Sequence, residues 1–224
     1  MRVSVVIPTL NEERCIAGTI EQTRASGPCE IIVVDGGSTD QTVDLAGGAD
    51  VVIESPPGRG TQQNNGAKEA SGDVLLFLHA DCRLEPGVFD AIASALRDPR
   101  CIGGCFRQTI DARGIGYRLL ELGNAWRVKT IGWAYGDQGI FLRRRLFEEV
   151  GGFPDMPLME DLFLMKRIKG RGRFRLLSHR LHVDARRWSQ RGIIRQTLRN
   201  WRLLLLAHLG VSPARLARSY RDAR

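Results

Sequence analysis

Acidic side chains stand at two kinds of position in this chain. Some follow an apolar run, where a strand would end, and others lie at the start of a predicted helix. They are Asp35, Asp81, Asp137 and the adjacent Glu160 and Asp161. Carboxylates in such positions take protons as general bases or hold divalent cations. Each also has a plain structural explanation as a turn residue or a helix cap. A chemical role therefore depends on several of them meeting at one site.

The segment HAD places His79 two residues before Asp81. Alternate side chains of an extended segment point the same way, so an imidazole and a carboxylate can reach one ligand there. This pair suits Mn²⁺ or Mg²⁺ held jointly with phosphate groups. The alternative is a solvated turn in which the core satisfies His79. Likewise, Glu160 and Asp161 stand in the first turn of a predicted helix, where capping alone explains carboxylates.

Strands and helices alternate along the first hundred residues, which indicates βαβ units and a parallel sheet. In a doubly wound sheet the loops after the strands meet at one edge, so we expect Asp35 and Asp81 to face one pocket. The predicted strands lie at 3–7, 30–34, 50–54 and 74–78. Four helices are predicted between and after them: one capped by Asn11, one capped by Ser38 or Thr39, one near 61–70, and one that starts at Pro86.

The second half of the chain is less regular, and no flexible linker separates it from the first. Its predicted elements are a strand at 101–110, a helix at 115–129, a short strand at 139–142 and a helix at 157–170 closed by Gly170.

Residues 191–210 predict a basic amphipathic helix. Three interpretations remain open: the apolar stripe packs on the domain, the helix lies in the interface of an anionic membrane, or the stripe joins two copies as a homodimer. A short final helix is predicted after Ser212 and Pro213. The apolar stripe holds Ile194, Leu198, Trp201 and Leu205, and the basic stripe holds Arg191, Arg195, Arg199 and Arg202.

Composition indicates a folded chain with a full core, since 43% of 224 residues are hydrophobic. The five cysteines form no C-x-x-C pair, so we expect a reducing compartment and a cytoplasmic location. The N-terminal apolar run meets Asn11, Glu12 and Glu13 before a signal peptide could form. No apolar run approaches the roughly 20 residues that span a bilayer.

The net charge of +8 is unevenly placed along the chain. Residues 1–100 carry 15 acidic and 8 basic residues, whereas residues 162–224 carry 2 acidic and 17 basic residues. This distribution predicts an anionic partner at the C-terminal end. Nucleic acid, a phospholipid surface and a phosphorylated substrate all fit it.

Five segments resemble, in order and spacing, the motifs of family 2 glycosyltransferases with the GT-A fold, especially short bacterial members without transmembrane helices. The resemblance spans residues 2 to about 170 and implies an α/β fold with a mixed, mostly parallel, Rossmann-like sheet flanked by helices. A GT-A domain would occupy 1–180, with a nucleotide-binding half at 1–100 and an acceptor half at 101–180. Residues 181–224 would be a basic helical extension. The segments are VSVVIPTLNEE, IIVVDGGSTDQT, GRGTQQNNGAKEASGDVLLFLHADC, GDQGIFLRR and GGFPDMPLMEDLFLMKRI.

The resemblance implies an inverting transfer of a sugar from a nucleoside-diphosphate sugar to an acceptor hydroxyl. Asp81 would hold the cation that bridges the donor diphosphate, and Asp161, beside Glu160, would take the acceptor's proton. The acceptor would be lipid-linked or a small molecule. The residues implied to contact the nucleotide sugar are Pro8, Thr9, Glu12, Asp35, Gln63, His79, Asp81, Gly136, Asp137 and Gln138.

Two positions depart from the family pattern, and a third residue is a further candidate contact. His79 replaces the first acid of the D-x-D motif, so its metal or ribose contact is open. Gln63 stands where many relatives have an arginine near the base. His182 is a candidate metal or diphosphate contact, and the alternative is an ordinary surface or core histidine.

Two other classes of protein share some of these features. A sugar nucleotidyltransferase shares a similar core, but its glycine-rich phosphate loop is missing after the first strand, where PTLNEERC stands. The second class is a protein that binds nucleic acid or an anionic surface and has a degenerate GT-A-like scaffold. It would explain the basic C-terminal part, but not the acids at the strand ends. We therefore expect no nucleic-acid partner.

Overall fold

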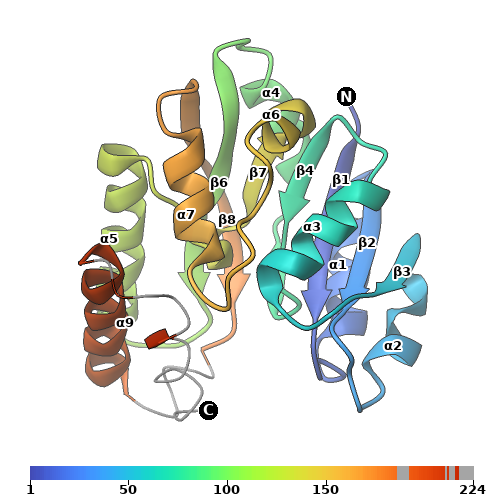
Figure 1. Ribbon diagram of the computed structural model, residues 1–224, viewed down its shortest axis with the longest axis horizontal. Coiled ribbons are helices and arrows are strands. Elements are labelled where there is room, and N and C mark those ends of the chain that lie inside the picture. Colours follow the sequence, from blue (N-terminus) through green and yellow to red (C-terminus); the bar gives the residue numbers. More distant parts are fainter. Residues whose placement is uncertain (186–191, 210, 212–214, 217–224) are drawn as a thin grey trace.

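A computed structural model (Figure 1) describes residues 1–185, 192–209, 211, 215 and 216. One sheet of eight strands runs through it in the order β3-β2-β1-β4-β7-β6-β8-β5. The strands are β1 (Val3–Thr9), β2 (Glu30–Asp35), β3 (Val51–Glu54), β4 (Val74–Phe77), β5 (Cys82–Leu84), β6 (Cys101–Ile110), β7 (Ile140–Arg143) and β8 (Arg173–Val183). The helices are α1 (Ile16–Ala25), α2 (Thr42–Leu45), α3 (Arg59–Glu69), α4 (Val88–Ala95), α5 (Ile115–Ile131), α6 (Arg144–Glu149), α7 (Glu160–Ile168) and α9 (Ile193–His208), with 3-10 helices η1 (Ala46–Gly48) and η2 (Gly136–Gln138).

The four strands predicted in the first half are confirmed. β1 lies between β2 and β4 and is parallel to both, and β3 continues the parallel set beyond β2. β1, β2 and β4 are buried along their whole length, which is why each reads as a continuous apolar run. The carboxyl ends of β2, β1 and β4 therefore lie in a row at one edge of the sheet.

The second half makes the sheet mixed. β7 runs antiparallel to β4 and β6, whereas β8 runs parallel to β6 and antiparallel to β5. The predicted α/β class and mixed, mostly parallel sheet are confirmed. The sequence did not predict α6, β5 or β8: β5 has only three residues, and β8 alternates arginines with half-buried residues instead of forming an apolar run.

Helices cover both faces of the sheet (Figure 1). One core cluster joins Val5 and Leu76 to Ile16 and Ile20 of α1 and to Ile92 of α4. The second core cluster packs the opposite faces of β1 and β4 against α3, α6 and α7, through residues that include Val6, Phe77, Ala67, Phe147 and Leu164. The sheet is thus the middle of three layers, which leaves its strand ends as the place for a site.

Three predicted helix caps are wrong. α1 begins at Ile16, because Asn11 adopts a φ of 56° and its side chain accepts a hydrogen bond from the Thr39 backbone instead. α2 begins at Thr42 after Gln41, since Ser38 donates its hydroxyl to Asp35. α4 begins at Val88, and Pro86 lies before its capping Gly87. For α1 and α2, the side chain expected to cap the helix makes a contact within the loops instead.

The helix expected from residue 157 begins only at Glu160, because Met159 has a φ of 66° and turns the chain. Its expected end is confirmed, since Gly170 has the left-handed φ of 82° that glycine adopts readily. All five cysteines are free thiols, as their spacing predicted.

α9 confirms the predicted basic helix, but it packs by an unexpected face. Leu203 and Gln196 are buried, whereas Leu198, Trp201 and Leu205 of the predicted apolar stripe are more than half exposed. The interpretation in which that stripe packs on the domain is therefore wrong for these three residues. The described residues do not include Arg191 or the side chain of Ile194. Of the predicted final helix they include only residues 215 and 216. Over the part of the chain that the structure describes, no helix is both long and apolar enough to cross a membrane.

Candidate active site

A pocket of about 150 Å³ opens at the carboxyl edge of the sheet, between η2, the start of α7 and one face of α9. β4 leads into it, since His79 follows that strand by two residues. Arg59 reaches it from the first turn of α3. The lining residues are Arg59, His79, Tyr135, Gly136, Asp137, Leu158, Met159, Glu160, Asp161, Leu162, Asn200, Leu203 and Leu204.

Asp161 is fixed in this pocket by two backbone groups. Its Oδ2 accepts a hydrogen bond of 2.8 Å from the Gly136 N–H, and its Oδ1 accepts one of 2.7 Å from the Leu162 N–H. The first bond joins segments 25 residues apart, so η2 and α7 hold the carboxylate jointly. Asp161 remains half-buried, which leaves it accessible from the pocket.

Gly136 lies close to both Asp161 and His79. A Cβ atom at this position would stand 2.8 Å from His79 Nε2, which is too close unless the imidazole moved, and 3.6 Å from Asp161 Oδ2. Glycine at this position therefore lets the imidazole lie against η2. The site unites three segments whose residues were predicted separately.

Glu160 has a different environment from its neighbour. It is 4% exposed and lies 3.5 Å from the guanidinium of Arg59. Burial raises the pKa of Glu160, and the charge of Asp161 raises it further, while Arg59 opposes the shift. Glu160 is buried and paired with Arg59, whereas Asp161 is accessible from the pocket, so Asp161 is the carboxylate of the pair that a ligand in the pocket can reach.

A chain of polar side chains supports η2 from behind. Gln108 Nε2 donates to Asp137 Oδ2 at 2.7 Å, and Asn124 Nδ2 donates to Gln108 Oε1 at 2.6 Å. Arg127 donates to Gln138 Oε1 at 2.7 Å and lies 3.7 Å over the Tyr135 ring. The orientation of Asp137 and Gln138 thus depends on β6 and α5.

Sequence reasoning missed Gln108, Asn124, Arg127, Tyr135 and Arg59. The available signal was weak: Asn124 and Arg127 are three residues apart, so they lie on one face of α5. Nothing local in the sequence distinguishes such a pair from a solvated face.

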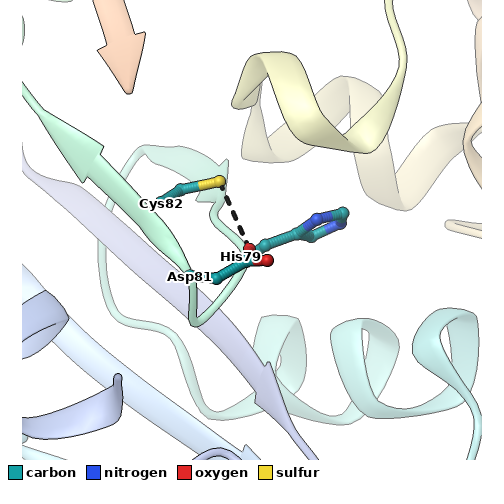
Figure 2. A group of neighbouring side chains, drawn as sticks. All are labelled: His79, Asp81 and Cys82. Atoms are coloured by element: carbon teal, nitrogen blue, oxygen red, sulfur yellow. Dashed lines mark hydrogen bonds between the residues drawn. The ribbon is translucent and has the colours of Figure 1, made fainter. Parts of the chain in front are cut away.

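His79, Asp81 and Cys82 form a candidate cation site on the turn after β4 (Figure 2). One ligand atom from each of them lies within 4.8 Å of the others, and Cys82 Sγ donates to Asp81 Oδ1 at 3.7 Å. Carboxylate suits Mn²⁺ or Mg²⁺, imidazole suits several divalent transition metals, and a thiolate favours softer ions such as Zn²⁺. These residues therefore fit a cation. His79 also belongs to the wall of the Asp161 pocket, so the two places are neighbours.

Asp35 is held by its own loop at the end of β2. It is 2% exposed, and its carboxylate accepts hydrogen bonds from the N–H groups of Gly37 and Ser38 at 2.9 and 2.7 Å and from Thr9 Oγ1 at 3.1 Å. Asp81 lines a second pocket, with Arg14 among its neighbours. Asp35 lines neither that pocket nor the one around Asp161, so these two pockets do not bring Asp35 and Asp81 together.

The remaining predicted residues of the nucleotide side lie around the ends of β1 and β2. Pro8 and Thr9 are buried at the end of β1, and Glu12 is half-buried in the loop that follows. Gln63 is 2% exposed on α3, and its Oε1 has no hydrogen bond within the described residues. Its neighbour Gln62, which was not predicted, donates at 2.8 Å to the carbonyl groups of both Thr9 and Val34 and so ties β1 to β2.

His182 lies apart from the His79 cluster, on β8 opposite Arg83. Its Nδ1 is 2.9 Å from Asp111 Oδ1, and its Nε2 is 3.8 Å from Glu85. Burial alone would raise the pKa of Asp111, but hydrogen bonds from His182 and Arg83 outweigh it and lower the pKa. The structure thus gives His182 a carboxylate partner, and its role toward a metal or diphosphate stays a prediction.

Comparison with known proteins identifies the family. The family model described as Glycosyl transferase family 2 matches residues 4–151, so the chain belongs to this family. It is 28% identical over 199 residues to the probable glycosyltransferase YdaM of Bacillus subtilis, and this match covers 76% of the chain and 47% of YdaM. It is 35% identical over 174 residues to the glycosyltransferase AglJ of Haloferax volcanii, and this match covers 72% of the chain and 54% of AglJ. The chain thus spans about half the length of these relatives.

Solved structures share the fold. TarS of S. aureus, in complex with UDP-GlcNAc, matches with a TM-score of 0.66 and 20% identity over 82% of this chain and 58% of that chain. Glucosyl-3-phosphoglycerate synthase of Mycobacterium tuberculosis, in complex with Mn²⁺, UDP and glucosyl-3-phosphoglycerate, matches with a TM-score of 0.59 and 22% identity over 81% of this chain and 70% of that chain. These likenesses confirm the predicted GT-A fold.

Proposed function

We propose that the protein transfers a sugar from a nucleoside-diphosphate sugar to an acceptor hydroxyl, with inversion at the anomeric carbon. One observation carries this proposal: Asp161 accepts a hydrogen bond from Gly136 at the carboxyl edge of the sheet, and His79 of the cation cluster packs against the same glycine. The position offers a base and a diphosphate site at neighbouring points. Family membership supports the reaction class.

The reaction is a single displacement. The acceptor oxygen attacks the anomeric carbon from the face opposite the diphosphate, while its proton passes to Asp161. The bond between the anomeric carbon and the diphosphate oxygen breaks, and the nucleoside diphosphate leaves with the electron pair. A positioned base of this kind contributes about 10² to 10⁴ in rate. Glu160, whose burial raises its pKa, pairs with Arg59 and supports the first turn of α7.

Asp81 and His79 would hold a divalent cation, Mn²⁺ or Mg²⁺, and Cys82 lies close enough to join them. When bound, such a cation stabilises negative charge on the departing diphosphate. Complexes of glucosyl-3-phosphoglycerate synthase with UDP contain Mn²⁺ or Mg²⁺, which supports this assignment. His182 is a further candidate contact for the cation or the diphosphate.

The donor would lie along the carboxyl ends of β2, β1 and β4. Pro8, Thr9, Glu12, Asp35 and Gln63 would form its nucleotide side, and η2 with Gly136, Asp137 and Gln138 its sugar side. The structures of TarS with UDP-GlcNAc and with UDP support a nucleoside-diphosphate donor. The undecaprenyl-phosphate transferase of Serratia proteamaculans, 26% identical over 63% of this chain, supports a lipid-linked acceptor. A cytoplasmic location, on which the donor supply depends, stays a prediction.

A panel of nucleotide sugars tests the reaction class. With Mn²⁺ or Mg²⁺ present, we expect at least one donor to raise the melting temperature and to release its nucleoside diphosphate. The readouts are thermal shift and coupled detection of the diphosphate. A panel in which no donor binds or turns over would contradict the proposed function.

A further inference from the structure

α5 and α9 expose an unusual number of large apolar side chains. Scattered single hydrophobics are normal on a protein surface, whereas clustered ones mark an interaction site. Eight such residues that are more than half exposed fall on these two helices or one residue past the end of α9. They are Ile115 (81% exposed), Leu119 (62%), Leu122 (65%) and Trp126 (65%) on α5, and Leu198 (58%), Trp201 (65%), Leu205 (60%) and Leu209 (71%) on and just after α9.

The spacing places each set on one face of its helix. Successive members are three or four residues apart, which is the repeat of a helical stripe. Each helix packs on the domain by the other side: α5 buries Tyr117 and Val128, and α9 buries Leu203. Leu203 and Leu205 are two residues apart, about 200° around the helix. The exposed stripes therefore face away from the domain.

The two helices are neighbours. A Cβ atom at Gly116 of α5 would lie 3.1 Å from the side chain of Ile193 at the start of α9. Ile193 also packs against the small cluster of Ile110, Tyr117 and Ala185. Figure 1 shows α5 and α9 at the same end of the sheet, beyond β6 and β8. The stripes thus belong to one region of the molecule.

The net positive charge of α5 and α9 indicates which kind of partner this apolar surface would bind. α5 and α9 carry six basic residues and one acidic residue, Glu121, and the exposed Arg195, Arg202 and Lys129 are among the basic ones. A second copy of the chain would bring cations against cations, which opposes self-association. Apolar and aromatic side chains with flanking arginines instead match a bilayer interface with anionic headgroups.

The opposite face of α9 reaches the active site. Asn200, Leu203 and Leu204 line the pocket that holds Asp161. If the exposed stripe of α9 rested on a bilayer, the pocket with Asp161 would therefore lie on the opposite side of the same helix. We propose that α5 and α9 together dock the protein on an anionic bilayer, and that the acceptor hydroxyl belongs to a lipid-anchored molecule. The assignment of the acceptor rests on the proposed function, whereas docking itself does not.

Vesicle flotation tests the docking. The full chain is mixed with phosphatidylglycerol-containing vesicles or with pure phosphatidylcholine vesicles, and the bound fraction is measured at low and high salt. We expect binding to the anionic vesicles only, weakened by salt. The double variant Trp126→Gln/Trp201→Gln should bind about tenfold less or weaker still, because it removes one interfacial anchor from each helix. The matched control Val43→Gln/Leu45→Gln, on the partly exposed α2, should bind like the unchanged chain.

Two results would overturn the proposal. One is equal flotation of the unchanged chain and the tryptophan variant, or no flotation of either. The other is a dimer in sedimentation that the tryptophan variant separates, which would make the stripes a contact between copies. Thermal shift by the nucleotide-sugar donor, measured on the same preparation, distinguishes the failures: donor binding without flotation refutes docking alone, and flotation without binding of any donor refutes the proposed function.

Discussion

His79 stands where the cation cluster meets the pocket of the proposed base. Its ring packs against Gly136, and one of its nitrogens lies within 4.8 Å of ligand atoms on Asp81 and Cys82. The sequence left open whether this imidazole binds metal, contacts ribose or fills the turn. Separations of up to 4.8 Å from Asp81 and Cys82 are compatible with a metal ligand.

Replacing His79 tests that role through the choice of cation. His79→Asp exchanges a nitrogen donor for an oxygen donor, and Mg²⁺ prefers oxygen whereas Mn²⁺ also accepts imidazole. We expect the ratio of Mn²⁺ to Mg²⁺ affinity to fall by about tenfold in the variant. Isothermal titration with each cation alone measures it.

His179→Asp, on β8, is the matched control and should leave both affinities unchanged. If His79→Asp also leaves them unchanged, His79 is not a ligand, and the interpretation of a satisfied turn histidine is correct.

At the scale of elements, the site depends on contacts between segments far apart in the chain. Gln108 of β6 connects Asp137 of η2 to Asn124 of α5 through hydrogen bonds of 2.7 and 2.6 Å. Asp137 is half-buried, and this bond ties its Oδ2 to β6. We therefore expect Gln108 to be a positioning residue that acts through Asp137.

A double-mutant cycle measures this dependence. Gln108→Leu should lower the rate of transfer by about tenfold to a hundredfold, as loss of a supporting hydrogen bond at a site commonly does. Asp137→Asn should lower it as well, and the double variant should be no slower than Asp137→Asn alone, because both changes remove one interaction. Steady-state kinetics with a donor from the panel provide the rates.

Losses that simply add in the double variant would contradict the positioning role. A fall in melting temperature without a change in rate would show that Gln108 serves stability only.

At the scale of the whole molecule, local patterns predicted the first half of the fold well. β1, β2 and β4 are buried on both faces, so their apolar runs identify them without knowledge of their neighbours. β8 is different, because its arginines alternate with half-buried residues and its pairing with β6 is not visible in the sequence.

The site was predicted in part for the same reason. Motifs placed Asp161, Gly136 and His79 individually, but their meeting around η2 depends on tertiary contacts that no single segment encodes. α9 is apolar on two faces, so the pattern could not indicate that Leu203 packs on the domain while Trp201 stays exposed. Its contribution to the pocket wall appears only in the structure.

The central claim is that Asp161 takes the acceptor's proton, and Asp161→Asn tests it most directly. Asparagine keeps the shape and one oxygen for the Gly136 N–H, but it loses the bond from the Leu162 N–H and cannot accept the proton. We expect transfer to fall by about 10² to 10⁴ while donor affinity, measured by titration of the same preparation, stays within about twofold. Asp90→Asn, an exposed carboxylate on α4, is the matched control and should transfer at the unchanged rate. Full activity in Asp161→Asn, with normal donor binding, would contradict the account.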